Sequence, residues 1–192
     1  MNQAVTTETA APVLQYSHMG LMVKDIDPME DFYVRVLGFT MTDKGRARRH
    51  GNEGPAMVFM TLDPREHHQL FLAEGRPDGV TSDAIIHHLS FRLKCLGDLK
   101  KMNDRLKAES DREIRAACHG NTWSLYGLDP EMNSVEFFVE TPWYVHQPFY
   151  KPMDFNQSEE EIISRTKEAV EIADGFKPID QYYTELEEQI QS

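Results

Sequence analysis

The sequence has little of what marks several large classes of protein. Only two cysteines occur in 192 residues, Cys95 and Cys118, so no disulfide framework is predicted and a reducing compartment fits. No apolar run approaches the roughly 20 residues that span a bilayer. Residues 1–13 have neither the basic start nor the apolar stretch of a signal peptide. We therefore expect a cytoplasmic protein with a flexible N-terminal arm over residues 1–13 and no membrane partner.

Positive charge is also scarce. Lys and Arg number 20 against 32 Asp and Glu, which gives a net charge of −12. Phosphate backbones need a basic footprint, so no nucleic acid partner is expected. Hydrophobic residues at 40% and charged residues at 27% are ordinary for a soluble globular protein.

Strand and helix patterns alternate along the chain in an order that repeats. Period-two alternation predicts a strand and period-3.6 spacing predicts a helix. The first half predicts a strand, a helix and three strands at 14–23, 29–36, 39–43, 56–62 and 69–74. The second half predicts the same order at 84–93, 96–107, 114–117, 122–127 and 134–140. The pairs His18/His88 and Asp63-Pro64/Asp129-Pro130 stand at nearly equal offsets, which favours a duplicated βαβββ module in an α+β domain over 14–140, with modules at about 14–75 and 84–140.

The last part of the chain, residues 141–192, differs in character. Aromatic residues and prolines predict irregular structure as far as residue 152. A helix follows over 158–174, with a capping box at Ser158 and Glu161 and a stop at Gly175, and a second helix is predicted over 179–189. We expect a C-terminal helical extension that covers the domain or a partner subunit, and a homodimer is the preferred oligomer.

Two of the eight histidines stand out by position. His18 and His88 occupy equivalent places in the opening strands of the two modules, so the modules can present them across a shared cavity. His87 is the alternative ligand to His88. On a strand His87 shares its face with apolar residues, whereas His88 shares its face with Ser90 and Arg92. His88 is therefore the predicted ligand, and His87 a packed, hydrogen-bonded neighbour.

Glu136 supplies a carboxylate within an otherwise apolar strand. A buried carboxylate needs a partner, although an edge strand with Glu136 facing water would need none. With His18 and His88, Glu136 forms a two-histidine, one-carboxylate set, the arrangement typical of non-haem Fe(II) oxygen chemistry. Fe(II) is the predicted metal, and Mn(II), Co(II) or Zn(II) suit the same ligands.

The segments SHMGLMV, HHLSFRL and YGLDPEMNSVEFF resemble the vicinal oxygen chelate (glyoxalase/bleomycin resistance/dioxygenase) superfamily. The resemblance covers about residues 14–140. It implies that the two modules pair into one cupped, incompletely closed barrel. Within the superfamily the chain is most similar to single-domain type I extradiol dioxygenases. These open a catechol-type ring with O2, so the resemblance implies a small aromatic diol as substrate and a place in aromatic hydrocarbon catabolism.

The same resemblance implies three catalytic residues. REHHQLFL resembles the stretch with the acid–base histidine, which selects His68 over His67. Tyr126 matches a tyrosine that hydrogen-bonds the substrate oxygen. His119 matches a substrate-contacting histidine, although it stands closer to Tyr126 than the family pattern has it. His68, Tyr126 and His119 are therefore the expected catalytic set.

Other activities of the same superfamily remain open from the sequence. A Mn(II)-dependent thiol transferase that inactivates fosfomycin, an isomerase or lyase, and a non-enzymatic small-molecule binding protein use the same scaffold. Glyoxalase-type isomerisation is disfavoured because those sites usually take a fourth protein ligand. The first-module equivalent of Glu136 falls near Leu70 instead.

Overall fold

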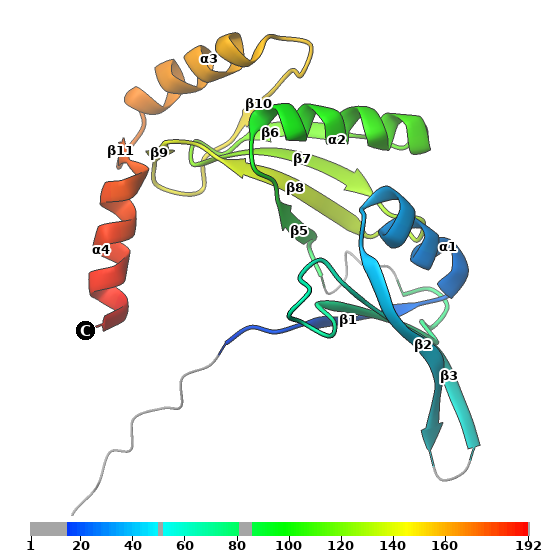
Figure 1. Cartoon of the computed structure of the whole chain (residues 1–192). Coiled ribbons are helices and arrows are strands. Elements are labelled where there is room, and N and C mark those ends of the chain that lie inside the picture. The colour runs from blue at the N-terminus through cyan, green and yellow to red at the C-terminus, as the bar shows by residue number, and fades with distance from the viewer. Residues whose placement is uncertain (1–14, 50–51, 81–85, 192) are drawn as a thin grey trace, which may run out of the picture.

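The computed structural model describes residues 15–49, 52–80 and 86–191, and two twisted sheets dominate it (Figure 1). The predicted arm at 1–13 and the first residues of the predicted strand 84–93 lie outside this range. The first sheet has the order β1-β4-β3-β2, and the second has the order β10-β6-β7-β8-β5. The described residues combine helices with these sheets, which confirms the predicted α+β fold, and they form no closed barrel.

Each sheet is built from one repeat of the same plan. In the first module β1 (Met19–Val23) pairs in parallel with β4 (Leu70–Glu74), and β2 (Thr40–Arg49) and β3 (Asn52–Thr61) complete the sheet. In the second module β5 (Leu89–Arg92) pairs in parallel with β8 (Ser134–Glu140), next to β7 (Thr122–Leu128) and β6 (Arg115–Cys118). The duplicated order that the sequence predicts is therefore present in the pairing itself.

Several predicted boundaries were wrong in an instructive way. The opening strands are shorter than predicted, so His18 and His88 each lie one residue before their strand. Backbone at such a position is free of the sheet ladder, which gives an imidazole more freedom to turn toward a ligand. The β2–β3 hairpin is longer than predicted, and it projects beyond the rest of its sheet (Figure 1).

Helices cover one face of the structure. The first module has α1 (Ile26–Asp31), capped by the Asp25 side chain, which continues as a π-helical turn, η1 (Phe32–Val36). The second has α2 (Leu96–Glu109). Alternate strand residues turn toward the helices and join a single hydrophobic cluster, which includes Val23, Leu72, Leu99, Leu125 and Phe137. That cluster spans both modules, so the opposite faces of the sheets remain for polar groups.

Polar contacts also tie the modules together at the turn before β8. The Glu131 carboxylate accepts hydrogen bonds from the backbone N–H groups of Lys24 and Asp25, which follow β1. It also pairs with Arg76, with 3.2 Å between the charged atoms, and both side chains are almost fully buried. The Tyr33 hydroxyl donates to buried Asp129 in the same turn. One turn of the second module thus anchors the ends of three elements of the first.

The C-terminal extension forms the predicted helices. Ser158 caps α3 (Glu159–Glu171) through the predicted capping box with Glu161, and Gly175 has a φ of 74° after its end. Next comes α4 (Ile179–Gln191). The prediction that residues 141–152 are irregular was wrong in part. They contain β9 (Trp143–Tyr144), which pairs with β11 (Lys177–Pro178), and β10 (Lys151–Pro152), which adds to the edge of the second sheet beside β6.

Candidate metal centre

His88 and Glu136 meet on the second sheet. The Nε2 atom of His88 lies 3.1 Å from Oε2 of Glu136, and the side chain of Glu136 is 11% exposed. Glu136 lies on β8, which has β7 on one side and β5 on the other. The edge-strand interpretation, in which Glu136 faces water, is therefore excluded for this structure.

Ser90 holds the Glu136 carboxylate in place. Its hydroxyl donates to Oε2 of Glu136 at 2.5 Å, and the two residues are direct partners across β5 and β8. Burial raises the pKa of Glu136, but hydrogen bonding, with Ser90 foremost, and the neighbouring His88 lower it by more, so the net shift is downward. Glu136 is consequently ionised at neutral pH, as a metal ligand must be.

Tyr126 and His119 form a second pair beside this carboxylate. Tyr126 is the direct cross-strand partner of Glu136, and its ring centroid lies 5.8 Å from that of His88. Nδ1 of His119 faces the backbone carbonyl of Phe149 at 2.9 Å, and Nε2 faces the Tyr126 hydroxyl at 2.9 Å. A carbonyl oxygen only accepts, so Nδ1 carries the proton and Nε2 accepts from Tyr126. Burial, followed by hydrogen bonding to Glu136 and the charge of that carboxylate, raises the pKa of Tyr126 well above its usual value and keeps the phenol protonated.

His18 and His68 form a separate pair on the first module. Their ring centroids lie 4.4 Å apart, and both rings lie near Phe71. Burial, with the neighbouring His18 and His67, lowers the pKa of His68, which favours the neutral imidazole. His18 does not join His88 and Glu136. Among the described residues, no group of three or more His, Cys, Asp or Glu side chains stands close enough to hold a metal.

Residues next to both pairs line one cavity. Ser17 and Met19, the neighbours of His18, line a cavity of about 390 Å³ together with His88 and Ser90. Residues of the opening strands of both modules thus line one cavity, although His18 itself lies against His68 and is not among its lining residues.

The histidines that neighbour His88 and His68 were the alternatives to them. His87 was expected to be packed, but its side chain is exposed; the predicted hydrogen bond to His88 is present, at 2.7 Å between the Nδ1 atoms. His67, the alternative to His68, contacts Asp43 through Nε2 at 2.8 Å and His68 through Nδ1 at 2.9 Å. His67 therefore has a partner on both ring nitrogens, whereas Nε2 of His68 has no hydrogen bond to any residue that the structure describes.

The first module has no second carboxylate at the equivalent position. Ser90, Glu136 and Tyr126 form one row across the second sheet. The corresponding row of the first sheet is Gly20, Phe71 and Phe59. The equivalent of Glu136 is therefore Phe71, one residue from Leu70. Glu136 is therefore the single carboxylate in these two rows, whereas a metal site with four protein ligands would need a further ligand from the first module.

The donor set on the second sheet fits a divalent cation. An imidazole nitrogen and an ionised, nearly buried carboxylate oxygen 3.1 Å apart can bind the same ion, and both are ligands that iron and manganese accept. Ser90 supplies the outer hydrogen bond that fixes the carboxylate. This role of Ser90 was not predicted from the sequence. Its place on the same strand face as His88 was the available signal.

Comparison with known proteins identifies the family of this chain. Residues 15–137 match the Glyoxalase/Bleomycin resistance protein/Dioxygenase superfamily. Two curated relatives from Rhodococcus globerulus are biphenyl-2,3-diol 1,2-dioxygenases 2 and 3. They are 31% and 30% identical over 69% and 65% of this chain. The match spans 65% and 62% of their own lengths, which is less than two thirds.

Solved structures show the same fold. A glyoxylase/bleomycin resistance protein/dioxygenase domain from Frankia sp. EAN1pec has a TM-score of 0.56 at 21% identity, over 68% of this chain and 94% of that one. The fosfomycin resistance protein FosX from Mesorhizobium loti has a TM-score of 0.52 at 16% identity, with the same coverage. At these identities the likeness concerns the fold alone. The match over residues 15–137 and the duplicated modules make this chain a member of the Glyoxalase/Bleomycin resistance protein/Dioxygenase superfamily.

Proposed function

We propose that this protein is an extradiol dioxygenase, which opens a catechol-type ring with O2 at a mononuclear Fe(II) centre. The observation that carries the proposal is the His88–Glu136 pair at 3.1 Å, with Tyr126 and His119 beside it. The two curated relatives, named as biphenyl-2,3-diol dioxygenases, favour this activity and suggest a bulky aromatic diol as substrate.

In this proposal His88 and Glu136 hold the metal with His18 as the third ligand. His18 has to leave the His68 ring to do so, since the two rings lie 4.4 Å apart in the structure. A bound metal would supply the Lewis acid that ring opening with O2 requires. Mn(II) suits the same ligands.

The chain's own residues then have separate tasks. Tyr126, whose hydroxyl lies 2.9 Å from Nε2 of His119, can accept a hydrogen bond from a diol hydroxyl through its oxygen. His68 is biased toward the neutral form, and its free Nε2 can take that proton and return it. Phe59 and Phe71, with ring centroids 5.7 Å apart, form an apolar surface beside His68.

Oxygen uptake tests the proposal. Protein loaded anaerobically with Fe(II), with iron verified at about one per chain as expected for a mononuclear site, is mixed with a panel of catechols that includes 2,3-dihydroxybiphenyl. We expect uptake of one O2 for each diol, a yellow ring-opened product, and loss of both in His18→Ala and Glu136→Ala. Asp63→Ala, which alters a partly exposed turn carboxylate, is the matched control and should retain activity.

Absence of uptake with every diol, despite verified iron, would contradict the dioxygenase proposal. Thiol-dependent turnover of an epoxide with Mn(II) would then identify the transferase activity. Ligand affinity that chelators leave unchanged would identify a binding protein.

A further inference from the structure

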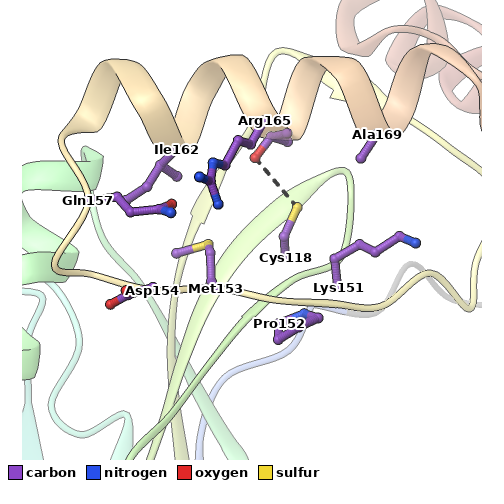
Figure 2. Close-up of a pocket in the computed structure, with 10 residues that line it drawn as sticks. Cys118, Lys151, Pro152, Met153, Asp154, Gln157, Ile162, Arg165 and Ala169 are labelled. Atoms are coloured by element: carbon purple, nitrogen blue, oxygen red, sulfur yellow. Dashed lines mark hydrogen bonds between the residues drawn. The ribbon is translucent and has the colours of Figure 1, made fainter.

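A second cavity, of about 260 Å³, lies between α3 and the β6–β10 edge of the second sheet (Figure 2). We propose that it binds a small organic carboxylate with an apolar body. The proposal does not depend on the metal centre, because the cavity lies on the other face of the sheet.

The position follows from strand alternation. Cys118 and Trp123 are cross-strand partners, and both contact Thr166 of α3. The Trp123 indole N–H donates to the Thr166 hydroxyl at 2.8 Å, so α3 is fixed over this face. Neighbouring strand residues point to opposite faces, so Glu136, Tyr126 and Ser124 share the face away from α3. A ligand under α3 therefore does not compete with a ligand at His88 and Glu136.

The charges in the cavity favour an anion. Arg165 of α3 and Lys151 of β10 line it, and neither forms an ion pair with any residue that the structure describes. The one acidic lining residue, Asp154, already accepts a hydrogen bond from the backbone N–H of Asn156. Two unpaired cations in one cavity are notable in a chain with a net charge of −12. Figure 2 shows Arg165 reaching from α3 toward Met153, with Gln157 beside it.

The walls favour an apolar body behind the anionic group. Pro152, Met153, Ile162 and Ala169 line the cavity, and Met153 is a flexible side chain that adapts to varied shapes. A planar guanidinium recognises a carboxylate through two parallel hydrogen bonds. The volume suits a single ring with a carboxylate rather than a large cofactor. Benzoate is therefore a suitable probe.

Titration calorimetry with benzoate tests the site. For a ligand of this size we expect a Kd on the order of 0.1–1 mM. Arg165→Gln should weaken binding about tenfold, because it removes a charge-assisted contact. Lys151→Gln should weaken it less, because the Lys151 ammonium lies on the far side of Cys118 from the Arg165 guanidinium (Figure 2). Lys167→Gln is the matched control, since Lys167 lies on the same helix and pairs with Glu171 outside the cavity. It should bind as the unaltered protein does.

Two further measurements locate the ligand and define its chemistry. The methyl resonances of Met153 and Ile162 should shift on binding, whereas that of the exposed Met132 should not. Benzyl alcohol, which lacks the charge, and inorganic phosphate, which lacks the apolar body, should both bind much more weakly. The proposal would be overturned if either probe bound as well as benzoate, or if Lys167→Gln weakened benzoate binding as much as the cavity variants do. It would also be overturned if no benzoate bound up to about 10 mM, which is a hundredfold above the tight end of the expected range.

Discussion

Ser90 donates to the Glu136 oxygen that lies nearest His88, at 2.5 Å, from the strand position directly opposite. Removal of this hydroxyl leaves the carboxylate free to turn and raises its pKa toward the usual value. We expect Ser90→Ala to lower metal affinity about 10–100-fold, the usual effect of losing such a supporting contact. Calorimetry with Mn(II) measures it. Ser164→Ala, which removes a similar hydroxyl–glutamate contact on the exposed side of α3, should have no effect.

The roles of His67 and His68 can be separated by substitution. His68→Gln should retain iron but lower kcat about 10²–10⁴-fold, because it removes the proposed acid–base group. His67→Gln should cause a smaller loss, since His67 contacts Asp43 and only orients its neighbour. Steady-state oxygen uptake with matched iron content distinguishes them. A larger loss in His67→Gln would reverse the assignment.

The sequence predicted the sheets better than it predicted the site. Duplicated spacing identified the modules, and strand alternation separated Glu136 from the apolar face of its strand, whereas Tyr126 was selected only by the family resemblance and proves to be the direct cross-strand partner of Glu136. Alternation cannot give the rotation of a side chain that precedes a strand, so the contact of His18 with His68 could not be predicted. The exposure of His87 has the same cause, because residues 87 and 88 precede β5 and need not alternate. Cross-strand partners such as Ser90 require the register, which a single sequence does not contain.

Gly20 lies opposite Phe71, and the Phe71 ring leaves no room for a side chain at position 20. A Cβ placed there would lie 2.1 Å from the Phe71 ring. Gly20→Ala should therefore destabilise the fold by about 1–3 kcal/mol, as overpacking does. Urea denaturation measures the loss. Gly45→Ala on β2 has open space and should change stability much less. In Gly20→Ala/Phe71→Ala the two effects should not add, because the clash requires both side chains. Additivity would contradict this explanation.

Asp129 should make stability fall as pH rises. Its carboxylate is buried and accepts from Tyr33, from Asn133 and from the backbone of Glu131. Burial raises its pKa above the model-compound value of 3.8 by more than these hydrogen bonds lower it. Between the unfolded and folded pKa values the folded state holds the extra proton, so the free energy of unfolding decreases with pH across that window.

Asp129→Asn removes the titrating group, so comparison with the unaltered protein isolates the effect. Urea unfolding at intervals from pH 4 to pH 7 should show the stability advantage of Asp129 over Asn shrinking as pH rises. Each unit by which the folded pKa exceeds 3.8 corresponds to about 1.4 kcal/mol. Asp63→Asn in the equivalent turn of the first module is the control. Hydrogen bonds from the backbone and side chain of Arg65 lower the pKa of Asp63. The stability difference between Asp63 and Asn should therefore change with pH in the opposite direction, and the change should be small because the side chain is partly exposed. A stability advantage of Asp129 that grows with pH would contradict the assignment, because it would mean that hydrogen bonding outweighs burial at this turn.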